Sequence, residues 1–154
     1  MIIMEDKKMD NNFVETHIKD FLLGGKAEFT IKNMNSGKFH KYKVSVGKTK
    51  DIWFVRILDG NKITYAGYLK YDLGGELVYA QGSKGMFAAN DEVIVGLLWV
   101  FRHSEKMNPA IKIIHHGKCA RCGKKLSDEE SIGIGFGPHC WELVKAMRIK
   151  SEVA

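Results

Sequence analysis

The sequence lacks any apolar run able to cross a membrane, because no stretch approaches the roughly 20 apolar residues of a spanning helix. Its first residues, MIIMEDKKMD, also lack the basic start and long apolar run of a secretory leader, so we do not expect secretion. Apolar residues make up 45% of the 154 residues and charged residues 27%, which permits a packed core and excludes wholesale disorder. We therefore expect a cytoplasmic protein of one domain, or of one domain with a small satellite.

Motifs of the common enzyme classes are also missing. The chain contains no GxSxG, no HExxH, no P-loop and no Ser-His-Asp order. The run GIGFGP at residues 133–138 precedes an expected helix, as phosphate-binding loops do, but such loops follow a strand within a βαβ unit. We expect this run to pack against the nearby cysteines, and we expect a protein that is not an enzyme.

Cysteine is scarce, and its three copies all lie in the last quarter of the chain. An odd count with a CxxC pair indicates a reducing compartment and a metal site rather than a disulfide framework. Cys119 and Cys122 form the pair, and Gly123 lets the turn close so that both thiolates reach one ion. Cys140 follows at the start of the last expected helix, where the helix dipole favours a thiolate. This arrangement predicts a structural Zn²⁺ in a treble-clef-like module.

A closed structural zinc site needs a fourth ligand. The candidates are His115, His116 and His139, with Glu142 last among them. His139 is next to Cys140 in the chain, and adjacent residues rarely reach one ion together. The side chains of His115 and His116 point to opposite sides of an expected strand, so only one of them can turn toward the cysteines. We prefer His115, with His116 as the alternative.

Short runs of strand-forming residues, separated by turn residues, predict a series of strands. They cover approximately residues 27–33, 38–46, 51–58, 62–69 and 76–81, with a further strand at 110–115. Apolar periodicity predicts helices over residues 12–23, 90–103 and about 138–150. The third strand run, IWFVRIL, is apolar on both sides, which is typical of a central strand.

These elements predict an α+β protein in which a curved antiparallel β-sheet with two packed helices precedes a C-terminal treble-clef-like zinc module. The expected division is a flexible N-terminus at residues 1–10, an α+β domain at 11–109 and a zinc-binding module at 110–154. Zinc is expected to supply folding energy to a module that has little core of its own.

The chain carries 24 Lys and Arg against 18 Asp and Glu, and the positive charge is concentrated in residues 24–50 and 111–150. In the second expected strand lysines alternate with Phe39 and Tyr42, a pattern that suits the phosphates and bases of a single strand. The candidate contacts are Lys38, Lys41, Lys43, Lys48 and Lys50 on the strands, with Arg121, Lys124 and Lys125 beside the cysteines. In the alternative interpretation, Tyr42 and Trp53 belong to the core and the lysines form a solvated edge that discourages aggregation.

Residues 115–140 read HHGKCARCGKKLSDEESIGIGFGPHC. This segment resembles an uncharacterised family of small phage and bacterial proteins, whose members carry the pattern H-x-G-R-C-x-x-C-G-R-x-L-T-x-P-x-S-I-x-x-G-I-G-P-x-C. Residues 25–44 and the run YAGYL are similar too, so the resemblance covers most of residues 20–145. The chain departs from the pattern at Glu129, where proline is usual, and by one extra residue in the GIGFGP run.

The resemblance matches His115 to the histidine of the family pattern, and it implies a role in phage DNA metabolism or in countering host defence within the host cytoplasm. We expect a non-enzymatic, zinc-stabilised protein that binds nucleic acid, DNA or RNA, and single strands above all. The alternative is a phage-encoded inhibitor that docks on a host defence or nucleic-acid-processing enzyme, using acidic residues 91–92 and 128–130. A third interpretation is a zinc-dependent hydrolase.

Overall fold

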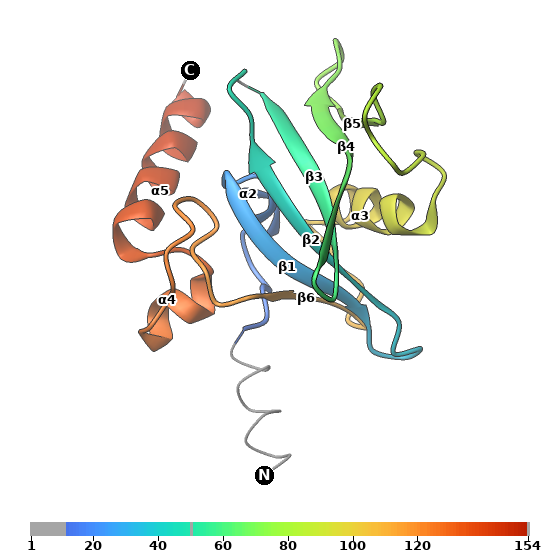
Figure 1. Ribbon diagram of the computed structural model, residues 1–154. Helices are drawn as coiled ribbons and strands as arrows, with labels where there is room; N and C mark the ends of the chain where they lie inside the picture. Colours follow the sequence, from blue (N-terminus) through green and yellow to red (C-terminus); the bar gives the residue numbers. More distant parts are fainter. Residues whose placement is uncertain (1–11, 50, 154) are drawn as a thin grey trace.

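The computed structural model describes residues 12–49 and 51–153, so the flexible start expected at residues 1–10 lies outside the described residues. Within this part of the chain, six antiparallel strands form one sheet in the order β5-β4-β3-β2-β1-β6, and the sheet curls into a half-barrel (Figure 1). The strands are β1 (Lys26–Asn33), β2 (Phe39–Val46), β3 (Ile52–Asp59), β4 (Lys62–Tyr71), β5 (Leu77–Ala80) and β6 (Ile111–His115). The predicted antiparallel meander and the central place of β3 are confirmed.

The edge strand β6 is hydrogen-bonded to β1, so a segment that the sequence division places in the zinc-binding module contributes to the sheet. The residues before helix α2 run along the other edge of β6. There Phe13 pairs with the strand, and the Val14 N–H donates to the Ile113 carbonyl at 2.8 Å. The helix predicted from residue 12 is therefore wrong in its first half, because an open strand edge offers these residues backbone partners. Helix α2 spans only Ile18–Leu22.

One face of the sheet is covered by α2 and by α3 (Glu92–Arg102), and the core lies between these helices and the strands (Figure 1). Helix α3 begins where the Asp91 carboxylate accepts the Val93 N–H at 3.0 Å. Tyr42 of β2 lies beneath it with 1% of its surface exposed, and its hydroxyl donates to the Val93 carbonyl at 2.7 Å. Burial, with the nearby carboxylates of Asp91 and Glu92, raises the pKa of Tyr42 well above its ordinary range. The phenol therefore remains a hydrogen-bond donor at neutral pH.

Two further helices, α4 (Glu129–Ile134) and α5 (Pro138–Val153), lie together at one side of the sheet (Figure 1). The sequence interpretation assigns no helix to α4. Its N-cap is Asp128, whose carboxylate accepts the Ser131 N–H, and it ends at Gly135, whose φ of 87° lies in the left-handed region. An acidic N-cap and a closing glycine are ordinary helix signals, so this short helix was readable from the sequence. No described helix is long and apolar enough to span a membrane.

The hydrogen bond between Tyr42 and Val93 joins the sheet to α3, and it predicts a measurable stability effect. We expect Tyr42→Phe to lower the free energy of unfolding by about 1 kcal/mol, because a buried hydrogen bond is lost while the ring keeps its packing. Urea denaturation followed by circular dichroism measures this change. The control is Tyr68→Phe, since the Tyr68 hydroxyl has no hydrogen bond among the described residues. Equal stability of the two variants would contradict the prediction.

Candidate metal centre and basic sheet face

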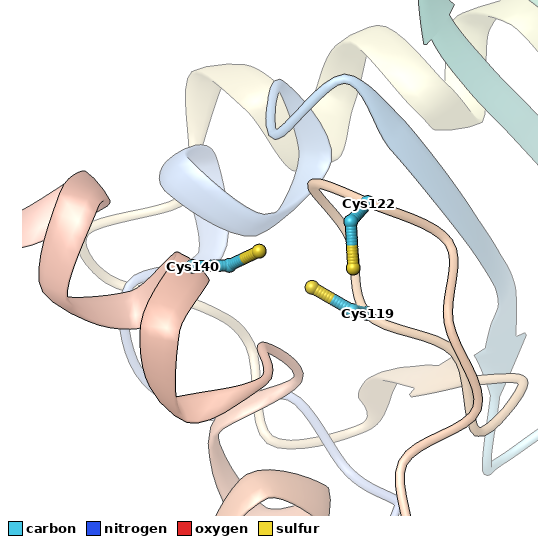
Figure 2. A group of neighbouring side chains, drawn as sticks. All are labelled: Cys119, Cys122 and Cys140. Atoms are coloured by element: carbon cyan, nitrogen blue, oxygen red, sulfur yellow. The ribbon is translucent and has the colours of Figure 1, made fainter.

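The three cysteines meet between a C-x2-C turn and the first turn of α5, with their sulfur atoms directed toward one another (Figure 2). The three sulfur atoms lie within 4.8 Å of one another, and no disulfide joins them. Cys119 and Cys140 are buried, and Cys122 is half-buried. Tetrahedral zinc with Zn–S bonds of about 2.3 Å holds its sulfurs roughly 3.8 Å apart, so small movements bring this set onto one ion. The three cysteines are therefore close enough to hold a metal ion.

The C-x2-C turn belongs to a hairpin of residues 118–125, called the knuckle below. Lys118 and Lys125 pair as an isolated antiparallel bridge at its base. At its tip the Gly123 N–H donates to the Cys119 carbonyl at 2.9 Å, and Gly123 has a φ of 80°. Only glycine adopts this left-handed conformation without strain, so the C-x2-C-G sequence specifies the turn that presents both thiols.

Backbone hydrogen bonds fix the knuckle to the sheet on one side and to the end of α4 on the other. The Lys26 N–H, at the start of β1, donates to the Ala120 carbonyl at 2.7 Å. The Ala120 N–H in turn donates to the Gly135 carbonyl at 3.0 Å. Gly24 passes so near that a Cβ there would lie 2.8 Å from the Ala120 oxygen, which makes glycine necessary at this crossing. The position of the knuckle relative to β1 is thus set by main-chain geometry.

The GIGFGP run supplies the apolar support of the metal centre. Phe136 is fully buried, with its ring at 6.3 Å from Phe21 of α2 and stacked at 5.6 Å on Trp141 of α5. Because Gly135 also accepts the hydrogen bond from the knuckle, the run packs against the cysteines as predicted. Gly133 lies within α4 and Gly135 ends that helix, so these glycines serve the turn between two helices.

The electrostatic environment distinguishes the Cys119 thiol from the Cys140 thiol. Burial raises the pKa of Cys119, but backbone N–H groups of Cys122, Gly137 and Arg121 donate to its sulfur and bring the pKa below its ordinary value. Burial and the neighbouring sulfurs raise the pKa of Cys140, against the Arg121 guanidinium, whose Nη1 lies 3.9 Å from the Cys140 sulfur. N–H groups aimed at sulfur and a nearby cation are the environment that stabilises thiolate ligands.

The side chain of His115 does not point to the three sulfurs, as the predicted fourth zinc ligand would. It is 1% exposed, its Nε2 lies 2.6 Å from the Ile132 carbonyl, and its Nδ1 accepts the Gly117 N–H at 3.0 Å. Burial lowers the pKa of His115 below its ordinary value, despite the hydrogen bond to Ile132, and so favours the neutral ring. Both ring nitrogens are occupied by backbone groups, and the described atoms that cluster at the metal centre are the three sulfurs alone. Here His115 joins β6 to α4, and the fourth ligand stays a prediction.

The alternative ligand, His116, is also engaged on the sheet. Its Nδ1 lies 2.8 Å from a Glu28 carboxylate oxygen, and its Nε2 lies 2.8 Å from the Thr30 hydroxyl. The Lys118 ammonium binds the other Glu28 oxygen at 3.3 Å. His139 is exposed beside Cys140. Neither His115 nor His116 therefore reaches the sulfurs in this arrangement of side chains.

The sheet face opposite α3 is called the outer face below, and it carries most of the charge of the strands. Alternation places Lys41 and Lys43 of β2 on this face, since Tyr42 between them points into the core. Lys43 is opposite Arg56 of β3 in the register. The strand-borne charges of the outer face are Lys26, Glu28, Lys32, Lys41, Lys43, Arg56, Lys70 and Lys112. The one acid of this set, Glu28, is already paired with His116 and Lys118.

The other residues predicted to contact nucleic acid do not all lie on the outer face. Lys48 lies in the turn after β2 and lines a hollow of the outer face, whereas Lys50 lies outside the described residues. Lys38 is directed toward α3, where its ammonium lies 3.6 Å from the Glu92 carboxylate. On the knuckle, three exposed cations surround the cysteine turn: Arg121, Lys124 and Lys125. The structure thus gathers Lys41, Lys43 and Lys48 on one face, and it separates Lys38 from them.

Of the aromatic residues that the sequence interpretation names, Phe39 lies on the outer face, 53% exposed and with the Lys41 ammonium 6.0 Å from the centre of its ring. Tyr42 is 1% and Trp53 is 8% exposed, so both belong to the core, as the alternative interpretation holds. Besides Phe39, the outer face carries Phe54, Tyr65 and Tyr68, all half-buried. The sequence could have placed Phe54 on the outer face, because adjacent residues of a strand point to opposite faces and Trp53 is in the core. The side chains of Tyr65 and Tyr68 both lie on this face because the pairing of β3 with β4 shifts register between them.

These features define an α+β protein with a curled antiparallel sheet, one basic sheet face and a three-cysteine centre. Residues 115–145 match a family of unknown function, DUF6011. The matched segment holds all three cysteines, together with the end of β6, the knuckle, α4 and the first half of α5. No curated protein and no solved structure matches the chain. The family match marks the metal centre as the segment shared with other proteins, and its description assigns no activity.

The Glu28 carboxylate predicts a pH dependence of stability. Burial raises its pKa, but hydrogen bonds and charges from His116 and Lys118 outweigh this effect and leave the pKa below the ordinary 4.5. A depressed carboxyl pKa stabilises the fold above the unfolded-state pKa, and this stabilisation is lost as the pH falls through the folded-state value. We therefore expect wild-type stability to fall more steeply below about pH 4.5 than that of Glu28→Gln.

Urea unfolding midpoints measured in steps between about pH 6 and pH 3 test this expectation. The control is Glu105→Gln, which removes an exposed carboxylate from the turn after α3 and should leave the slope unchanged. Parallel pH profiles for the wild type and Glu28→Gln would show that the pairing at Glu28 contributes nothing to stability.

Proposed function

We propose that this protein binds nucleic acid, single strands above all, and that it is a zinc-stabilised binding protein rather than an enzyme. The observation that carries the proposal is the charge of the outer face, where cations from five neighbouring strands and one already-paired acid lie on the side free of α2 and α3. A cation-rich surface attracts polyanions and releases the counterions that nucleic acids condense. This interaction needs no catalytic group.

Zinc in the cysteine centre would hold the basic knuckle beside that face. The ion would join the C-x2-C turn to the first turn of α5, which are separate segments of the chain. Lys118 of the knuckle contacts Glu28 on the outer side of β1, so the knuckle cations continue the basic surface of the sheet. Arg121, Lys124 and Lys125 would then provide a second group of phosphate contacts.

The rival function, docking on a host enzyme, relies on five acidic residues, of which the fold already uses three. Asp91 caps α3, Asp128 caps α4, and Glu92 is paired with Lys38. These contacts account for three of the five acids without a partner protein and leave Glu129 and Glu130 exposed on α4, and we therefore rank nucleic-acid binding first. A stoichiometric protein complex that survives nuclease treatment, together with no direct nucleic-acid affinity, would favour the rival. A chelator-sensitive hydrolytic activity in a protein that stays folded would favour the hydrolase.

Metal analysis tests the zinc proposal directly. We expect reduced, purified protein to contain about one zinc ion per chain, since three thiolates converge on one point. Cys140→Ser should reduce the zinc content to a small fraction of this value and lower the melting temperature. Plasma mass spectrometry and a chelator titration monitored by circular dichroism measure both effects. Wild-type protein free of any transition metal would remove the proposal.

The same assay decides the part played by His115. The hydrogen bonds to Ile132 and Gly117 predict that His115→Asn retains zinc, although it loses stability, because the ring serves the backbone. Loss of the ion from folded His115→Asn would instead show that the histidine turns to the metal and completes the site.

Salt dependence tests the nucleic-acid proposal. We expect the affinity for a labelled oligo(dT) to fall steeply with salt, with a logarithmic slope of roughly −0.7 for each phosphate contact. The double substitution Lys41→Glu with Lys43→Glu should weaken binding at least tenfold and flatten the slope. Fluorescence anisotropy across a series of salt concentrations measures both quantities.

The matched control reverses two lysines away from the outer face. Lys19 lies on α2 near Tyr71, and Lys106 follows α3. Lys19→Glu with Lys106→Glu changes the net charge by the same amount, so it should reduce affinity far less. Affinity that is independent of salt, or equal losses in both double variants, would contradict binding by the outer face.

A further inference from the structure

Two hollows adjoin one another on the outer face, over β3 and β4. The first has a volume of about 550 Å³ and is lined by Ile52, Phe54 and Tyr68 with lysines around them. The second has a volume of about 410 Å³ and is lined by Phe54, Arg56, Tyr65 and Tyr68. Because Phe54 and Tyr68 line both hollows, they form one continuous depression, called the aromatic groove below. It is open to solvent, and its lining is mainly apolar.

A β-bulge brings the two tyrosines of the aromatic groove to the same face. In the register, Phe54 is opposite Tyr68 and Arg56 is opposite Tyr65, so the pairing skips one residue of β4 at Ala66. Strict alternation would direct residues 65 and 68 to opposite faces, and the extra residue cancels this difference. The Tyr79 hydroxyl lies 2.6 Å from the Ala66 carbonyl and 2.7 Å from the Phe87 carbonyl, which holds the bulge in place.

The rings of the aromatic groove are supported from the side, and glycines leave room for them. Phe54 meets Tyr65 edge to face at 6.0 Å, and the Arg56 guanidinium lies 6.0 Å from the centre of the Tyr65 ring. A Cβ at Gly47 would lie 2.5 Å from the Phe54 ring, and one at Gly82 would lie 3.2 Å from the Tyr68 ring. These contacts restrict the rings from the side, and none of the described helices lines either hollow.

The rim of the aromatic groove is cationic. Lys48 and Lys70 line one end, and Lys84 lines the other end together with Ser83. Arg56 lies between them and donates to the Ser45 hydroxyl at 3.0 Å, which orients its guanidinium. No carboxylate lines either hollow among the described residues. The groove therefore suits a polymer whose planar groups stack on the rings and whose negatively charged linking groups contact the cations around them.

We propose that the aromatic groove stacks the unpaired bases of a single-stranded nucleic acid, while Lys48, Lys70 and Lys84 contact its phosphates. The inference rests on the proposed nucleic-acid binding and states where and in what form the ligand is held. Exposed aromatic rings stack on any base, whereas the bases of a duplex are already stacked and face one another. A single strand is therefore selected over a duplex. An apolar peptide would use the rings but would leave the cations without partners.

The test compares three probes by fluorescence anisotropy and competition: an oligo(dT) of about 15 nucleotides, a duplex of the same length, and inorganic polyphosphate, which has charge without bases. We expect wild-type protein to prefer the single strand over the duplex. Phe54→Leu and Tyr68→Leu keep apolar bulk and remove the ring, so each should weaken oligo(dT) binding by about 5- to 100-fold. Their affinity for polyphosphate and their salt slope should remain those of the wild type.

Two further variants separate the ring from the fold. Tyr68→Phe retains the ring and should bind as the wild type does. Tyr71→Leu removes an aromatic ring from the opposite face of the same strand and should leave binding unchanged. Thermal melting of every variant identifies any that fails to fold. Photocrosslinking of wild-type protein to an oligonucleotide that contains bromodeoxyuridine provides a measurement without substitutions, and it should label Phe54, Tyr65 or Tyr68.

The outcomes distinguish this inference from the proposed function. Salt-dependent binding that is equal for single strand and duplex, or unaffected by Phe54→Leu and Tyr68→Leu, would overturn the aromatic groove and leave binding by charge intact. Crosslinks confined to the knuckle would do the same. Absence of binding to all three probes would overturn both proposals.

Discussion

The burial of one sheet face beneath α2 and α3 is the constraint on which the other features depend. Side chains alternate along each strand, so packing Tyr42 and Trp53 against the helices directs their neighbours to the opposite side. Charged side chains avoid the dry face because their desolvation is unfavourable, and they accumulate on the outer face. The basic surface is thus a consequence of where the core lies.

The cysteine centre concerns a second constraint, which is how the segment after β6 is held at the end of the sheet. The segment after β6 contains the knuckle, the short helix α4 and α5, and its buried apolar contribution is centred on Phe136. Gly24 lets its backbone approach Ala120 closely, and Gly135 leaves room for the Phe21 ring, but close approach alone does not fix the start of α5. Three converging sulfurs, with N–H groups and Arg121 directed at them, provide that connection when an ion is bound.

The two regions are joined through β1, which touches both. The Lys26 N–H binds the knuckle at Ala120, and Glu28 binds His116 and Lys118. A metal-held knuckle would therefore have a fixed place beside the outer face. The lysines would contribute affinity that depends on salt, and the rings would contribute contacts that depend on unpaired bases.

The sequence by itself determined the strands, α3, and the cysteines that share one site, because turn residues, apolar periodicity and the C-x2-C spacing are local signals. It also contained the caps of α4. Only the tertiary structure decided that β6 pairs with β1, that His115 serves the backbone, and that Tyr65 and Tyr68 share a face. These outcomes depend on partners far away in the chain: an open strand edge, a carbonyl of α4, and a bulge held by Tyr79. A local sequence pattern does not predict such contacts, since they form only when distant parts of the chain meet in the folded protein.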